Sequence, residues 1–199
     1  KSDALPGKYF ILEVSAELRQ RQQMLFANKA PHLVQVIEWL EQLPVQFTGT
    51  ILANEVLDAM PVHVVTWHNN KLFERGVTWK NNRFAWQGRP INNAELSHSA
   101  SQLMPQINPD SHSTYSYISE INLTAVHFMR SLTNFLQQGV ILLIDYGFGR
   151  SEYYHPQRNQ GTLMCHYRHH AHGDPFYLPG LQDITSHVDF SALTQAAED

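Results

Sequence analysis

Residues 9–29 read YFILEVSAELRQRQQMLFANK and contain the pattern that decides the fold class. The first six residues are a short apolar run with aromatic and β-branched side chains, which predicts a buried parallel strand. Ser15 is a residue type that caps helix N-termini, and residues 16–29 are rich in good helix formers. A strand followed at once by a helix is typical of an α/β fold.

Later segments extend this pattern. We expect further strands at residues 34–39, 48–54, 140–144, 162–167 and 184–189, and a helix over 120–138, followed by Gly139. The sequence therefore predicts one α/β domain over residues 1–199, with a mostly parallel sheet.

One region departs from the α/β pattern. Three short strands, at residues 62–67, 72–79 and 83–86, predict an antiparallel β meander, inserted in the domain at residues 62–87. Residues 88–114 are rich in Asn, Ser, His and Pro, and we interpret them as a loop with at most one short helix.

Composition excludes several function classes. The chain has 199 residues, 16% charged and 43% hydrophobic, with a net charge of −4, which argues against a nucleic-acid or anionic-membrane partner. The one cysteine, Cys165, allows neither an intramolecular disulfide nor a cysteine-rich zinc site. No apolar run reaches about 18 residues, so no transmembrane helix is predicted. The histidine-rich segment 165–174 lacks a zinc-peptidase motif, and we expect no metal.

Three polar clusters follow predicted strands, where an open α/β sheet binds its ligands. Glu13 could accept hydrogen bonds from both hydroxyls of a ribose, or could be a surface acid at a helix start. Glu55 and Asp58 lie three residues apart after the strand at 48–54 and could clamp a guanidinium, cap the turn or bind a metal. Residues 145–149, DYGFG, could approach a ligand closely or form a plain tight loop.

Four segments together resemble one family of enzymes. They are FILEVSAELRQRQ (residues 10–22), ILANEVLDAMPV (51–62), LLIDYGFGRSEYY (142–154) and GTLMCHYRHHAHGDPFYLPGLQDITSHVDFSAL (161–193). In this order they resemble the MidA-type class I methyltransferases, which include a mitochondrial complex I assembly factor that methylates an arginine. The resemblance covers about residues 8–193.

The resemblance implies a Rossmann-like class I methyltransferase sheet that binds S-adenosylmethionine. Glu13 falls on the acid that holds the ribose, and Trp39 and Leu40 fall near the adenine. Asn54 falls at the methionine and sulfonium end of the cofactor.

The resemblance also implies a protein substrate, methylated on an arginine side chain. Glu55 and Asp58 fall where this substrate would enter, and we expect them to orient its guanidinium as the catalytic residues. Two other interpretations remain open: a non-catalytic binding scaffold that holds a partner through the aromatic residues of the meander, and a nucleotide-binding oxidoreductase.

The chain departs from the family pattern at its start. The first strand and its glycine-rich loop are not present before Glu13, so we expect an incomplete catalytic domain with two unpaired inner sheet edges. Such edges predict one of three outcomes: a separate piece supplies the strand, the sheet closes the gap imperfectly, or the chain self-associates through these edges. The expected location is the bacterial cytoplasm, or the mitochondrion if the chain is eukaryotic.

Overall fold

The computed structural model describes residues 6–69, 71–107 and 116–198. The chain divides into two compact units. The first unit is Lys1–Thr48 with Phe135–Gln137, and the second unit is Gly49–Asn134 with Gln138–Asp199. Each unit is described by itself below.

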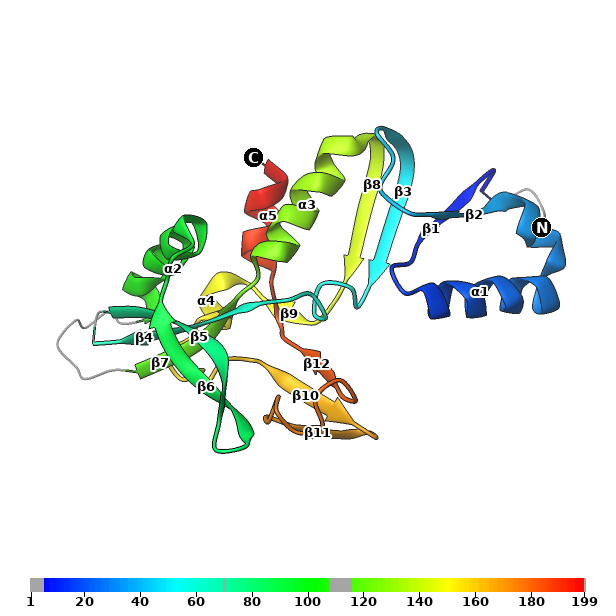
Figure 1. The fold of residues 1–199 in the computed structure, drawn as a ribbon. Coiled ribbons are helices and arrows are strands. Elements are labelled where there is room, and N and C mark those ends of the chain that lie inside the picture. Colours follow the sequence, from blue (N-terminus) through cyan, green and yellow to red (C-terminus); the bar gives the residue numbers. More distant parts are fainter. Residues whose placement is uncertain (1–5, 70, 108–115, 199) are drawn as a thin grey trace. The chain divides into compact units, whose positions relative to one another are not determined.

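The first unit is a β–α–β element (Figure 1). It comprises β1 (Tyr9–Leu12), α1 (Ala16–Lys29), a 3-10 helix (Pro31–Val36) and β2 (Ile37–Leu40), and β1 pairs with β2 in parallel. The Ser15 hydroxyl accepts the backbone N–H of Leu18 at 3.3 Å, which confirms the predicted helix start.

The predicted burial of this first strand is wrong. Phe10 and Leu12 of β1 are 39% and 40% exposed, and no residue of α1 is buried. A two-stranded sheet with one helix is too small to enclose an apolar core, so these apolar side chains stay in contact with water.

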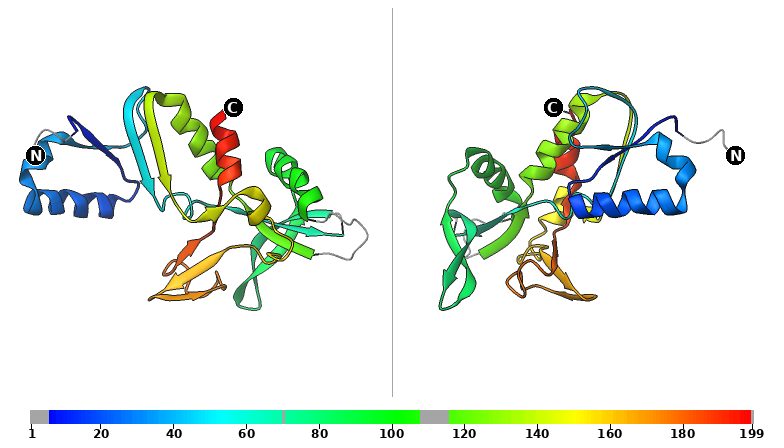
Figure 2. Two further views of the ribbon diagram at one scale, coloured as in Figure 1. Left: turned by 180° about the vertical axis from the view of Figure 1, so that it is seen from behind. Right: turned by 45° about the vertical axis from the view of Figure 1, so that its right-hand side comes forward.

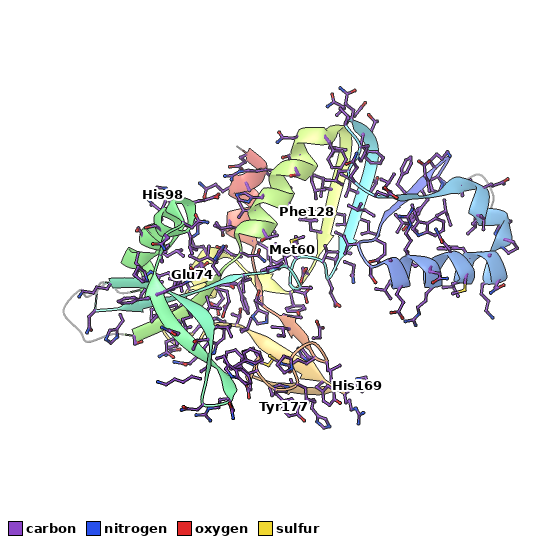
Figure 3. The ribbon with its side chains drawn as sticks, in the orientation of Figure 1. Met60, Glu74, His98, Phe128, His169 and Tyr177 are labelled. Atoms are coloured by element: carbon purple, nitrogen blue, oxygen red, sulfur yellow. The ribbon has the colours of Figure 1, made fainter. Side chains whose placement is uncertain are left out.

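In the second unit, α3 (Leu123–Phe135) and α5 (Phe190–Glu198) pack beside the strands β3 (Phe47–Asn54) and β8 (Leu136–Ile144), which pair in one sheet and run in the same direction (Figures 1 and 2). Gly139 makes this pairing close, because a Cβ there would lie 1.8 Å from the Gly49 carbonyl oxygen. An apolar cluster joins α3, α5 and β8, with Met60 and Phe128 packed against it (Figure 3). The predicted helix over 120–138 is shorter because Glu120 belongs to a strand and Leu136 begins β8.

The predicted meander is present. Strands β4 (His63–His68), β5 (Lys71–Lys80) and β6 (Arg83–Pro90) are antiparallel, and Asn81 and Asn82 turn the chain between β5 and β6 with φ of 52° and 58°. The sequence did not predict that β7 (Ser116–Ile121) joins them, in the order β6-β5-β4-β7.

Residues 88–114, interpreted as a loop with at most one short helix, contain α2 (Ala94–Ile107), which is longer than the expected helix, while residues 108–114 lie outside the described part of the chain. α2 covers the meander sheet, and the Trp67 indole N–H donates to the Ala100 carbonyl at 3.0 Å. A tertiary core therefore stabilises a helix for which the local sequence is a poor signal.

Short elements complete the second unit: β9 (Gly147–Phe148), α4 (Arg150–Tyr153), β10 (Met164–Tyr167), β11 (His170–His172), β12 (Asp183–Thr185) and β13 (Val188–Asp189). β13 pairs with β9 in parallel, and β10 pairs antiparallel with both β11 and β12. The strand predicted at 184–189 is thus two strands in different sheets.

The α/β class is confirmed, with both parallel and antiparallel pairs. The described strands form five separate sheets instead of one Rossmann-like sheet. Among the described residues, no helix is both long and apolar enough to span a membrane.

Candidate active site

The turn that follows β3 is held by the segment that follows β8. Glu55, directly after β3, has a φ of 49°, and its backbone N–H donates to the Ile144 carbonyl at 2.8 Å. The Asp145 carboxylate accepts the backbone N–H groups of Leu57 at 3.0 Å and Asp58 at 3.3 Å. Two of the predicted polar clusters therefore meet at one place, and each depends on the other for its geometry.

Asp58 is the buried acid at the centre of this arrangement, with 5% of its surface exposed. One carboxylate oxygen, Oδ2, accepts a very short hydrogen bond from the Tyr146 hydroxyl. The other oxygen, Oδ1, is buried and has no hydrogen-bond partner in the part of the chain that the structure describes. A buried carboxylate oxygen without a partner is costly, so this atom points to a ligand that donates a hydrogen bond.

Tyr146 remains protonated at physiological pH. Burial raises the pKa of Tyr146 to about 12, and the hydrogen bond to Asp58 adds to the shift, as do the negative charges of Asp58 and Asp145. Tyr146 is therefore a fixed donor that orients Asp58 and leaves Oδ1 available.

Asp58 lines a cavity of about 630 Å³, which we name the Asp58 cavity. Its charged walls include the acids Glu55, Asp58 and Asp183 and the cation Arg158. Arg158 also donates to a Glu152 carboxylate oxygen at 3.4 Å. With three carboxylates against one guanidinium, the cavity favours a cationic ligand.

One wall of the Asp58 cavity rests on a second buried acid, Glu120, which is 1% exposed. Its carboxylate accepts the Thr162 backbone N–H at 2.9 Å, the Thr162 hydroxyl at 3.0 Å and the Leu163 backbone N–H at 3.3 Å. Burial raises the pKa of Glu120, and these hydrogen bonds oppose the shift. Gly161 has a φ of +78°, and a Cβ there would lie 2.2 Å from the same carboxylate.

His187 connects this wall to Tyr146. Its backbone N–H donates to the Thr162 hydroxyl at 3.1 Å, and its ring packs edge-on against Tyr146 with 5.3 Å between centroids. Burial lowers the pKa of His187, and the positive charge of Arg158 lowers it further. The ring is therefore neutral at neutral pH and does not compete with a bound cation for Asp58.

Comparison with known proteins gives the family. The family model "Putative S-adenosyl-L-methionine-dependent methyltransferase" matches residues 3–199. A crystal structure of a Burkholderia thailandensis protein bound to S-adenosyl-homocysteine has 44% sequence identity and a TM-score of 0.85. This chain belongs to that methyltransferase family.

A high-resolution native crystal structure from the same organism gives a similar result, with 44% identity and a TM-score of 0.86. The two alignments cover 96% of this chain but 48% and 50% of those chains. The chain thus spans about half the length of these solved structures. Among curated proteins, no sequence matched.

The predicted cofactor residues of this chain are divided between the two units. Glu13 follows β1 in the first unit, where its carboxylate accepts the Ser15 backbone N–H at 2.9 Å and the Gln22 amide at 3.1 Å. The Trp39 indole donates to the same Gln22 side chain at 3.0 Å, and Leu40 pairs with Leu12. Glu13, Trp39 and Leu40 therefore lie together at the carboxyl end of two parallel strands.

In the second unit, Asn54 is the last residue of β3 and is exposed, while Glu55 and Asp58 both line the Asp58 cavity. Sequence reasoning missed the roles of Tyr146 and Glu120. Tyr146 lies in the polar cluster that follows an apolar strand, which was a usable signal. Glu120 gave none, because it stands at the start of a predicted helix, where an acid is ordinary.

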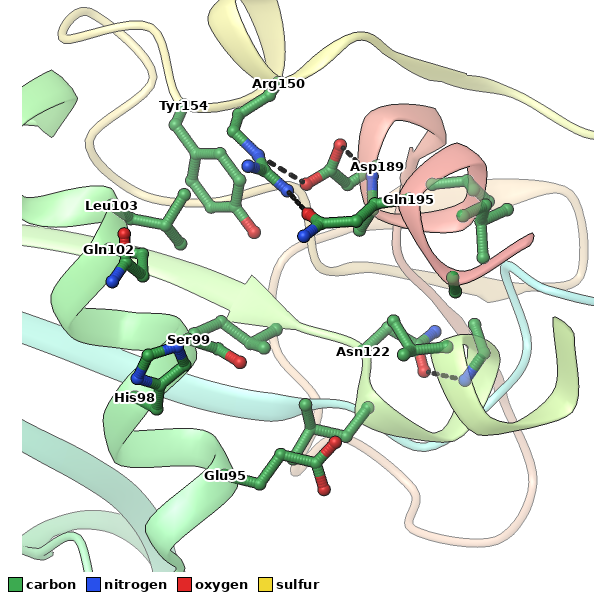
Figure 4. Close-up of a pocket in the computed structure, with 18 of the residues that line it drawn as sticks. Glu95, His98, Ser99, Gln102, Leu103, Asn122, Arg150, Tyr154, Asp189 and Gln195 are labelled. Atoms are coloured by element: carbon green, nitrogen blue, oxygen red, sulfur yellow. Dashed lines mark hydrogen bonds and ion pairs between the residues drawn. The ribbon is translucent and has the colours of Figure 1, made fainter. Parts of the chain in front are cut away.

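A further cavity, of about 550 Å³, lies between α2, α3, α4 and α5 (Figure 4). Its polar side chains bind one another: Arg150 lies 3.8 Å from Asp189 and 3.5 Å from the Gln195 amide oxygen, and Arg130 lies 3.6 Å from Glu95. None of the residues predicted from the sequence lines this cavity, so the Asp58 cavity is the candidate active site.

Proposed function

We propose that this chain is the part of an S-adenosylmethionine-dependent methyltransferase that holds an arginine side chain of a protein substrate. Membership of the methyltransferase family supports methyl transfer, and the relative bound to S-adenosyl-homocysteine supports the cofactor. The arginine is inferred from the chemistry of the Asp58 cavity.

The observation that carries this proposal is the buried Asp58 carboxylate. Tyr146 occupies Oδ2, and Oδ1 has no partner among the described residues. A guanidinium is planar, stays charged at any physiological pH and offers several N–H donors, so it suits a partly satisfied buried carboxylate with acidic walls. The Asp58 Oδ1 atom would accept hydrogen bonds from the guanidinium N–H groups. The hydrogen bond from Tyr146 would keep the Asp58 carboxylate from rotating.

Glu55 completes the proposed chemistry. Methylation of a guanidinium nitrogen would form an N–C bond while the S–C bond of the sulfonium breaks and neutral S-adenosylhomocysteine leaves. One proton is then released, because the product guanidinium carries the same charge as before. Glu55 lines the Asp58 cavity and is itself exposed, so its carboxylate can accept that proton and pass it to water. Alignment of the nitrogen with the methyl group supplies most of the rate.

The residues of the first unit fit the nucleoside part of the cofactor. An acid at the carboxyl end of a parallel strand is the usual partner of ribose hydroxyls, and Glu13 has this place, with Trp39 and Leu40 close by for the adenine. The role of Asn54, which belongs to the second unit, at the methionine end stays a prediction. When bound, the sulfonium of the cofactor supplies the electrophilic methyl group.

The test uses the full protein, tritium-labelled S-adenosylmethionine and an arginine-containing peptide, with the lysine peptide of the same sequence for comparison. We expect Asp58→Asn and Glu55→Gln to reduce methyl transfer at least about a hundredfold, while calorimetry shows unchanged cofactor affinity. Glu152→Gln is the matched control, since this acid is exposed and lies outside the cavity walls. Full activity of Asp58→Asn, or preference for the lysine peptide, would refute the proposal.

A further inference from the structure

A second cavity adjoins the Asp58 cavity on the side of the meander. It has a volume of about 470 Å³, and we name it the aromatic cavity. Its walls come from β4, β5 and β6 on one side and from residues 175–186 on the other, and they include Val64, Val77, Phe84, Trp86, Phe176 and Ile184. Among its lining residues, Asp58 is the one that carries a charge.

The aromatic side chains that line this cavity pack against one another. Phe176 packs against Trp86 with 5.1 Å between ring centroids and against Phe84 with 6.2 Å. The Arg75 guanidinium lies 4.7 Å from the centroid of the Trp86 ring. The Phe176 backbone N–H donates to the Asp174 carboxylate at 2.9 Å, which orders the turn that carries this ring. The cavity is thus formed before any ligand arrives.

This preformed cavity leaves apolar surface in water. Val77 is 58% exposed, Phe84 is 42% exposed and Ile184 is 39% exposed. Exposed apolar surface that is gathered around a concave site marks a place where a ligand or partner binds, because burial of that surface is favourable.

The two cavities adjoin each other, since Asp58, Leu163 and Thr185 line both of them. Asp58 stands at the junction and carries the buried oxygen, Oδ1, that has no partner among the described residues. One ligand that fills both cavities would therefore have a cationic hydrogen-bond donor next to an apolar group.

We propose that the aromatic cavity binds an apolar side chain of the substrate polypeptide, close in sequence to the residue whose cationic group binds Asp58. This inference rests on the proposed function, because it takes the Asp58 cavity as the acceptor site. It adds a specificity site: the protein selects an arginine that has a phenylalanine, leucine or similar residue as a near neighbour.

The first test measures occupancy without any methyl transfer. The full chain is labelled with fluorotryptophan, and the Trp86 signal in fluorine NMR is assigned with Trp86→Phe. The probes are the capped tripeptides Phe-Gly-Arg and Ala-Gly-Arg. We expect Phe-Gly-Arg to shift the Trp86 signal to saturation, with an affinity at least about tenfold higher than that of Ala-Gly-Arg. Trp67, which is 2% exposed and packs against Tyr117, is the internal control and should not shift.

Substitutions in the cavity walls test where the peptide binds. Phe176→Ala removes one wall and should abolish the advantage of the Phe peptide over the Ala peptide. Tyr177→Ala is the matched control, because this neighbouring aromatic residue is 48% exposed and packs against Tyr167 and His172 instead. Asp58→Asn should weaken both arginine peptides equally and leave the capped dipeptide Phe-Gly, which has no arginine, unaffected.

The outcomes separate this proposal from the function on which it rests. Equal affinity for the Phe and Ala peptides, with binding that still depends on Asp58, would overturn the aromatic cavity as a specificity site and leave the arginine proposal standing. Phe-dependent shifts that do not need Asp58, in a protein that methylates no arginine peptide, would overturn the proposed function. A stronger Trp86 shift with decanoate than with Phe-Gly-Arg would show an acyl-chain site and would also overturn the inference.

Discussion

Glu120→Gln is expected to destabilise the protein and to reshape the Asp58 cavity. The Glu120 carboxylate accepts N–H groups on both oxygens, from Thr162 at 2.9 Å and from Leu163 at 3.3 Å. A glutamine keeps one acceptor oxygen and places an NH₂ group against the other N–H. Two buried donors then lack acceptors, and since each costs about 1–3 kcal/mol, the loss of unfolding free energy should be at least about 2 kcal/mol.

The assay is urea unfolding of the full chain at neutral pH, followed by tryptophan fluorescence, with Glu152→Gln as the control. Glu152 is exposed and pairs with Arg158 at 3.4 Å, so its substitution should change the unfolding free energy by no more than about 0.5 kcal/mol. If Glu120→Gln were as stable as Glu152→Gln, the reasoning about buried donors at this wall would be refuted.

The contribution of Glu120 to the unfolding free energy changes with pH in a definite direction. The folded state raises the pKa of Glu120 from 4.5, so the folded protein binds this proton more tightly than the unfolded chain does. The contribution of this group to stability is therefore full below pH 4.5 and is lost as the pH rises through the folded-state pKa. The stability difference between the wild type and Glu120→Gln should be larger in acid than at neutral pH, and the opposite trend would contradict the raised pKa.

Three other predictions concern the same region. In a spectrophotometric titration, the phenolate absorbance that Tyr146→Phe removes should appear near pH 12, and its appearance near pH 10 would mean that the Tyr146 hydroxyl is not bound to Asp58. Gly161→Ala should destabilise the protein more than Glu120→Gln does, because the alanine Cβ would lie 2.2 Å from the Glu120 carboxylate and the φ of +78° disfavours alanine. Urea unfolding measures this difference, and a variant as stable as the wild type would contradict it. Leu52→Lys on β3, a residue 59% exposed, should reduce any self-association in light scattering without loss of helical circular dichroism, whereas unchanged association would exclude this strand as the contact.

Local signals predicted the elements that depend on local interactions. Ser15 and the helix formers after it predicted α1, and the three short strands at residues 62–67, 72–79 and 83–86 predicted the antiparallel strands β4, β5 and β6. The length and position of α2 were not predicted, because its stability comes from distant contacts, such as the hydrogen bond from the Trp67 indole to the Ala100 carbonyl. The predicted burial of β1 failed because burial depends on neighbours in space, and periodicity does not report them.

In the candidate site, too, local features could be predicted from the sequence and distant partners could not. Glu55 and Asp58 could be proposed from their place after a strand, and the structure brings them to one cavity. Their partners could not be proposed, because Tyr146 is 88 residues from Asp58, and Thr162 is 42 residues from Glu120. The placement of Glu13, Trp39 and Leu40 in the first unit agrees with a nucleoside site, and their role stays a prediction.

The backbone conformation at Glu55 lowers the stability of the fold, whereas its carboxylate serves the proposed reaction. Its φ of 49° lies in the left-handed region, which Asn69, Asn81 and Asn82 also adopt, as do Arg168, His169 and Leu178. A non-glycine, non-asparagine residue there costs about 1 kcal/mol, so Glu55→Gly or Glu55→Asn would relax the turn. Selection for a stable fold alone would therefore remove the acid from this position. A protein that had lost its activity should drift towards glycine or asparagine at residue 55, and a retained glutamate would mark a lineage in which the carboxylate is still in use.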